Sequence, residues 1–157
     1  MLIGSSSLYV LTLIGIGLKK GKQMPLQRIK QVILIRKDLK MRRGKEIAQG
    51  SHASMAFVMQ QIHSQLVTHD VSACLLNLSE VEKIWINNGS AKICLRVNSE
   101  DELLLYHEKA MAAELKSFLI QDSGRTEFHG QPTYTACAIG PDDSQKIDSI
   151  TSDLVLY

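Results

Sequence analysis

The sequence predicts one α/β domain in which a small sheet carries helices on both faces. Apolar runs typical of buried strands alternate with segments whose apolar residues recur at helical spacing. The chain has 157 residues, of which 45% are hydrophobic and 22% charged. This composition suits one globular domain with a substantial core and excludes a disordered protein.

The first predicted strand is the apolar run at residues 32–35, whose continuity indicates burial on both faces. After a basic loop, a helix is predicted to begin near Gly44 and to end near Leu66. Lys45 and His52 lie two turns apart on one face of this helix, the face that points toward the loop. Its first turns are rich in small residues, which indicates close approach of either the sheet or a ligand.

A short helix and a half-covered strand come next. Ser79, with Glu82 three residues later, forms a capping box that starts a helix through Trp85. Residues 91–97 alternate between apolar and polar, so this strand should be covered on one face and partly exposed on the other.

The following helix is predicted to start at a second capping box, formed by Ser99 and Glu102, and to run to about Ala113. Glu114 comes next, and glutamate resists the left-handed conformation that often ends a helix. We therefore expect this helix to end in a different way.

The last third of the chain predicts two strands and a helix. Residues 118–120 form a short, doubly buried strand that ends at Asp122, and residues 123–126 form a turn. Residues 134–139 form the next strand, which residues 140–143 close. A final helix presents Ile147, Ile150 and Leu154 to the core, and residues 155–157 tail off as an extended edge.

Positive charge is concentrated at the start of the chain, although the net charge is only +2. Residues 1–45 hold eleven of the 18 Lys and Arg residues, with Asp38 as their only acid. Six of these cations lie between the first strand and the first helix: Arg36, Lys37, Lys40, Arg42, Arg43 and Lys45. This distribution favours a polyanionic partner over a merely solvated surface.

The three cysteines, Cys74, Cys94 and Cys137, lack metal-ligand spacing and indicate a reduced, cytoplasmic setting. Cys94 and Cys137 fall in predicted strands, where we expect small core residues.

Residues 8–18 form an apolar run of eleven residues that is followed by lysines. A membrane-spanning helix needs roughly 20 such residues, and a secretory signal has its positive charges before the run. We favour an extension upstream of a true start at Met24, with a membrane anchor as the alternative. The predicted organisation is an extension at 1–24 and a domain at 25–157.

Three blocks carry a resemblance to a known family: DLKMRRGKEIAQGSHAS from Asp38, LIQDSGRTEF from Leu119 and TACAIGP from Thr135. They resemble, in order and spacing, the archaeal and eukaryotic type of peptidyl-tRNA hydrolase, and the resemblance covers about residues 30–157. It implies a three-layer α/β/α sandwich with a mixed, four-stranded sheet. The implied reaction is hydrolysis of the ester between a peptide and the 3′-terminal ribose of tRNA, without metal or organic cofactor.

The resemblance also implies site residues, each with a plainer alternative. Asp122 orients or deprotonates water, unless it only caps its strand beside Arg125 or Lys45. Lys45 neutralises phosphate or the developing oxyanion, unless it is a surface lysine.

Two threonines and a histidine complete the expected site. Thr126 and Thr135 offer hydroxyls to the water or to the ester carbonyl, although Thr135 also suits a plain strand position. His52 matches the family's Ser-His-Ala segment, with a structural hydrogen-bonding role as its alternative.

The expected partner is peptidyl-tRNA, held by Lys37, Lys40, Arg42, Arg43, Lys45 and Arg125. A homodimer is left open, and membrane contact through the N-terminal segment is not favoured. The rival hypothesis is a non-catalytic module that uses the same fold to bind RNA or a protein.

Overall fold

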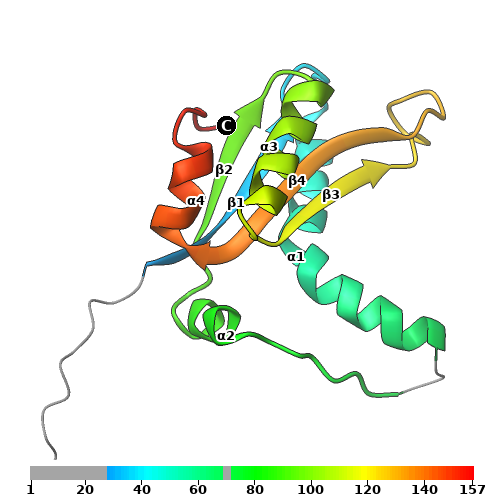
Figure 1. The fold of residues 1–157 in the computed structure, drawn as a ribbon. Coiled ribbons are helices and arrows are strands. Elements are labelled where there is room, and N and C mark those ends of the chain that lie inside the picture. Colours follow the sequence, from blue (N-terminus) through cyan, green and yellow to red (C-terminus); the bar gives the residue numbers. More distant parts are fainter. Residues whose placement is uncertain (1–27, 69–71) are drawn as a thin grey trace, which may run out of the picture.

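The computed structural model describes residues 28–68 and 72–157 (Figure 1). The predicted extension at 1–24, with its anchor alternative and the proposed start at Met24, lies outside this part of the chain. The elements follow the predicted order: β1 (Ile29–Arg36), α1 (Arg43–Thr68), α2 (Glu80–Asn87), β2 (Lys92–Val97), α3 (Glu100–Ala112), β3 (Ser117–Asp122), β4 (Thr133–Asp143) and α4 (Ser144–Thr151). None of the described helices is both long and apolar enough to cross a membrane.

The four strands form one mixed sheet in the order β2-β1-β4-β3, which confirms the expected α/β class. β1 pairs in parallel with β2, while β4 runs antiparallel to both β1 and β3. β1, β2 and β3 therefore point the same way and end at the same edge of the sheet. β1 is a central strand with both of its faces buried, Leu34 in the core on one side and Ile33 in the core on the other, which explains its continuous apolar run.

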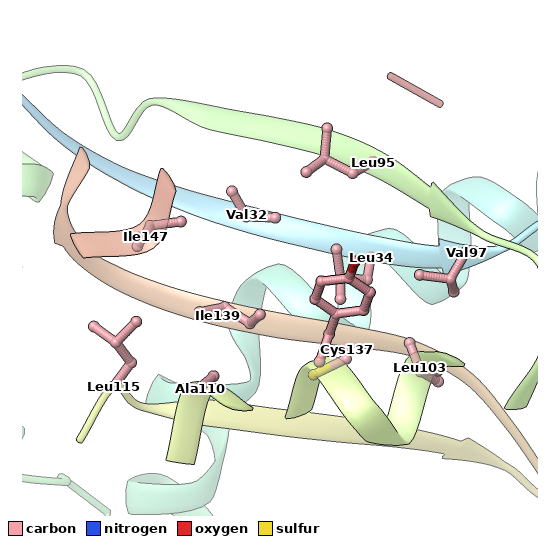
Figure 2. Close-up of a cluster of buried hydrophobic side chains, with 11 residues drawn as sticks. Val32, Leu34, Leu95, Val97, Leu103, Ala110, Leu115, Cys137, Ile139 and Ile147 are labelled. Atoms are coloured by element: carbon pink, nitrogen blue, oxygen red, sulfur yellow. The ribbon is translucent and has the colours of Figure 1, made fainter. Parts of the chain in front are cut away.

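One face of the sheet packs against α3 and α4 (Figure 2). Leu34 and Ile139 of the two central strands, Leu103 of α3 and Ile147 of α4 are all fully buried in this cluster. Side chains of alternating sheet positions project to this face, as strand geometry requires.

The opposite face packs against α1 and α2 (Figure 1). Ala53 of α1 is fully buried against Ile33 and Ala136 of the central strands. Phe57 of α1 meets Trp85 of α2 edge to face, with ring centroids 5.9 Å apart. Helices on both faces give the three layers.

Two burial predictions are wrong, because both depend on strand order. Residues 118–120 are only half-buried, since β3 is an edge strand. Cys94 is exposed, because α1 packs over β1, β3 and β4 and leaves that face of β2 open. Cys137, on central β4, is fully buried as predicted.

The end of α3 also differs from the expectation. Glu114 does adopt the left-handed conformation, with φ 57°. Its backbone N donates to Met111 O at 3.0 Å, and the N of Leu115 donates to Ala110 O at 2.9 Å. These two bonds close the helix in the way that a C-terminal glycine usually does.

The start of α2 agrees with the prediction, whereas the start of α3 and the end of β4 differ from it. The Ser79–Glu82 capping box is confirmed in both directions. At α3 only half of the predicted box forms, because the Glu102 carboxylate accepts from Asn98 N instead of Ser99 N. β4 continues to Asp143, beyond the predicted end.

Candidate active site

The candidate site lies at the sheet edge where β1 and β3 end and β4 begins. β3 ends at Asp122, and β4 brings Thr135 to the same edge from the opposite direction. β1 leads through the basic loop at residues 37–42 into the first turns of α1. Segments far apart in the sequence therefore meet there, as is usual for ligand sites at the carboxyl ends of strands.

The Asp122 carboxylate is the centre of the site. Its Oδ2 accepts hydrogen bonds from Lys45 Nζ at 2.5 Å and from Gln49 Nε2 at 3.0 Å. Its Oδ1 accepts from Gly124 N at 2.9 Å. The hydrogen bond from Lys45 lowers the pKa of Asp122, and the Gly124 N–H adds to this, while burial opposes it. The carboxylate is therefore charged at neutral pH.

Lys45 joins the two sides of the site. Besides Asp122, its Nζ donates to Thr126 Oγ1 at 3.1 Å and lies 5.5 Å from the centre of the Phe128 ring. The Lys45 side chain is only 13% exposed, so it is not an ordinary surface lysine. Lys45 thus contacts both Asp122 and Thr126, which were predicted to share its site.

Gln49 belongs to the site, although the sequence analysis did not single it out. Its Nε2 donates to Asp122, and its Oε1 accepts from Thr135 Oγ1 at 2.5 Å. Thr135 is fully buried and reaches Asp122 only through Gln49. Helical spacing could have identified Gln49, because it follows Lys45 by one turn on the same face of α1.

An open cavity of about 560 Å³ lies beside these contacts. Its lining includes Lys45, Gln49, His52, Asp122 and Thr126. His52 is exposed and makes no hydrogen bond with any residue in the described part of the chain, so its side chain is available to a ligand.

A larger, mostly apolar cavity of about 670 Å³ lies on the other side of α1, between that helix and β2. It contains none of the contacts to Asp122. We place the site at the smaller cavity, where the charged and polar groups converge.

Among the other predicted cations, Arg42 lines the cavity at the site, whereas Arg43 lines the larger cavity. Arg42 pairs with Glu127 at 2.8 Å, and Lys37 lies 3.7 Å from Glu46 and above the Tyr157 ring. The others are exposed cations with no ion pair in the described part of the chain: Lys40, Arg43 and Arg125. Within the residues that the structure describes, no group of three or more His, Cys, Asp or Glu is placed to hold a metal ion.

A charged carboxylate with a lysine and a hydroxyl beside an open cavity suits water-dependent cleavage of a substrate. Fold and site therefore define an α/β protein with a hydrolase-type site.

Comparison with known proteins narrows this class. The model of the family described as Peptidyl-tRNA hydrolase PTH2 matches residues 29–157, and the chain belongs to this family. Three relatives are each named peptidyl-tRNA hydrolase. The one from Methanothermobacter thermautotrophicus is 38% identical over 82% of this chain and 99% of its own length. The one from Sulfolobus acidocaldarius is 36% identical over 82% and 99%, and that from Methanopyrus kandleri is 38% identical over 81% and 97%.

Proposed function

We propose that this protein hydrolyses the ester bond between a peptide and tRNA and so returns tRNA to translation. The observation that carries the proposal is the set of hydrogen bonds from Lys45 and Gln49 to the charged Asp122, with Thr126 bound to Lys45, in a family of peptidyl-tRNA hydrolases. Membership of this family favours hydrolysis over the rival hypothesis of a non-catalytic binding module.

Asp122 is the group that directs water. A carboxylate offers about four acceptor positions, of which Lys45, Gln49 and Gly124 use three. The remaining position on Oδ1 can accept a hydrogen bond from water at the cavity. Because its pKa is lowered, Asp122 is a weak base, so it orients and polarises this water and accepts a proton from it only as the water attacks the ester.

Lys45 and Thr126 can stabilise the charge that forms on the ester. An ammonium group has three N–H donors, and Lys45 uses two of them, on Asp122 and Thr126. Because Thr126 Oγ1 accepts from Lys45, its own O–H is left to donate to the ester carbonyl oxygen.

The proposed reaction adds the water oxygen to the ester carbonyl carbon. Asp122 receives the water proton as the tetrahedral intermediate forms, and the bond from carbon to the ribose 3′ oxygen then breaks. The proton passes to that leaving oxygen, which restores Asp122 and frees the tRNA 3′ end. The peptide leaves as a carboxylic acid, whose remaining proton is lost to solvent to give the carboxylate.

The tRNA backbone is proposed to lie across the basic rim formed by Lys37, Lys40, Arg42, Arg43 and Arg125. These residues have no role within the Asp122 cluster, so their contribution is to binding. Because translation supplies the substrate, we also propose a cytoplasmic location.

The test is single-turnover hydrolysis of an N-blocked aminoacyl-tRNA by Asp122→Asn. General-base and water-positioning contributions are about 10²–10⁴-fold, and we expect a rate loss of that order with tRNA binding retained. Asp148→Asn is the matched control, because Asp148 pairs with Lys30 at 2.5 Å far from the site. A loss of less than about threefold in a folded Asp122→Asn protein would refute the mechanism. Binding of tRNA without any turnover by the wild type would support the binding module.

A further inference from the structure

Residues 155–157 lie beside the edge strand β2. The backbone N of Arg96 donates to Val155 O at 3.0 Å, and the N of Tyr157 donates to Cys94 O at 3.0 Å. Between these two bonds, Leu156 and Leu95 form an antiparallel bridge. An edge strand presents unpaired backbone groups, and this short segment satisfies two of them. The backbone of Tyr157 is therefore fixed to the sheet.

The Tyr157 side chain reaches from this edge of the sheet to the first turn of α1. Its hydroxyl donates a hydrogen bond to Glu46 Oε1. Tyr157 and Glu46 both line the larger cavity between α1 and β2. The ring is thus held at both ends, by the backbone bonds to β2 and by the hydroxyl bond to α1.

Lys37, the first cation of the basic loop, lies over this ring. Its Nζ is 4.5 Å from the centre of the Tyr157 ring and 3.7 Å from Glu46 Oε1. A separation of 3.7 Å is too long for a hydrogen bond, and an aromatic face attracts a cation without one. Neither contact therefore takes up an N–H donor of Lys37. Its side chain is 50% exposed, so these donors can reach a ligand from solvent.

We propose that Tyr157 is a positioning residue for tRNA binding, because its ring holds the Lys37 ammonium in place for a backbone phosphate. A free lysine side chain occupies many rotamers, and binding a phosphate restricts it. A lysine that is already held loses less freedom, and such preorganisation raises affinity. Tyr157 acts through Lys37 and has no contact of its own with the substrate. The inference rests on the proposed contact of tRNA with the basic rim.

The test is a double-mutant cycle of Tyr157→Ala and Lys37→Met, with the affinity of the full chain for deacylated tRNA as the measurement. The attraction of a cation for an exposed aromatic ring corresponds to about a two- to fivefold change in an equilibrium constant. We expect Tyr157→Ala to weaken tRNA binding by about that factor, although it removes no charge. In the Lys37→Met protein, Tyr157→Ala should have no further effect, because the group that the ring positions is missing.

Two further variants serve as matched controls. Tyr157→Phe keeps the ring and the backbone bonds to β2, so it should bind tRNA nearly as tightly as the wild type. Lys109 of α3 lies 4.6 Å from the centre of the Tyr106 ring. Lys109→Met removes the same charge and the same kind of contact outside the basic rim, and it should leave the affinity unchanged. In hydrolysis, the loss in Tyr157→Ala should appear in KM and not in kcat, because a phosphate contact is present both before and during the reaction.

The cycle separates this inference from the proposed function. Equal losses from Tyr157→Ala with and without Lys37 would show that Tyr157 only supports the fold, and would overturn the inference. Wild-type affinity in Tyr157→Ala, or a Tyr157→Phe protein that binds as weakly as Tyr157→Ala, would also overturn it. Full affinity in Lys37→Met alone would remove Lys37 from the proposed RNA surface, and the inference with it. Hydrolysis by these variants at saturating substrate would leave the proposed reaction standing in each of these cases.

Discussion

Arg42 and Glu127 form an ion pair across the mouth of the site. The Nε of Arg42 lies 2.8 Å from Glu127 Oε1, and the Arg42 backbone N donates to Oε2 at 3.3 Å. The Arg42 guanidinium holds the pKa of Glu127 below its usual range, so Glu127 is charged at neutral pH. Arg42 was predicted to contact tRNA, and this carboxylate partly cancels its attraction for phosphate.

We therefore predict that Glu127→Gln binds tRNA more tightly than the wild type. Arg42 then becomes a full phosphate contact, which steepens the salt dependence by about 0.7–0.9 in the log–log slope. The measurement is the affinity of each protein for deacylated tRNA at several salt concentrations. Glu80→Gln is the control, because it removes a similar carboxylate, paired with Lys83, from α2. Equal or weaker binding by Glu127→Gln would show that Arg42 does not contact the backbone.

The charge state of Asp122 should depend on Lys45. The pKa of Asp122 is depressed in the folded protein, so its stabilising contribution is complete above its unfolded pKa of about 3.9 and is lost as the pH falls through the lower, folded value. We predict that Lys45→Met raises the pKa of Asp122. The amide signal of Gly124, which donates to Asp122 Oδ1, reports this titration by NMR. An unchanged midpoint would contradict the assigned cause of the shift.

Thr135 should act through Gln49 and not by direct contact with substrate. We predict that Thr135→Val leaves Gln49 Oε1 without its buried donor, lowers the free energy of unfolding by about 1–3 kcal/mol and reduces the rate of hydrolysis. Thr135→Ser keeps the hydroxyl and should retain most of the stability and most of the rate of hydrolysis. Denaturant unfolding and single-turnover rates measure the two effects. If Thr135→Val kept the wild-type rate, Gln49 would not need this hydrogen bond to orient Asp122.

The left-handed residue at the end of α3 gives a stability prediction. Glu114 has φ 57°, a conformation that costs a non-glycine residue about 1–2 kcal/mol. Glycine loses more freedom on folding, so Glu114→Gly should stabilise the protein by about 0.5–1 kcal/mol in total. The hydrolysis rate should not change. A lower midpoint of urea unfolding would mean that the Glu114 side chain makes a compensating contribution.

The segment before the domain gives the last prediction. A protein that begins at Met24 should fold and hydrolyse substrate like the full chain, because the family match begins at residue 29. Circular dichroism and single-turnover rates measure this. An insoluble or unfolded product would show that residues 1–23 pack against the domain.

Much of the fold follows from local patterns. The apolar run of β1, the capping box at Ser79 and the alternation in β2 each depend on nearby residues. The start of α2 and the bounds of β2 were predicted closely, whereas the apolar run at 32–35 marked only the middle of β1. Lys45 and Asp122 could be placed in one site only through the three blocks, because no local pattern indicates that residues so far apart are in contact.

The wrong predictions depend on the order of strands, which local patterns do not contain. Cys94 is exposed because β2 lies beyond the reach of α1, and β3 is half-buried because it is an edge strand. Gln49 was missed for a related reason. Its two hydrogen bonds require the ends of β3 and β4 to lie side by side beneath α1.

The position of β1 in the middle of the sheet affects how the chain is made. β1 comes first among the strands, and both of its neighbours are synthesised later, β4 near the end. During synthesis the apolar residues of β1 therefore lack both neighbouring strands until most of the chain has left the ribosome. Pairing between such distant segments also slows folding. A newly made chain thus exposes the apolar β1 strand before either of its partner strands exists, which favours binding by chaperones that act on nascent chains.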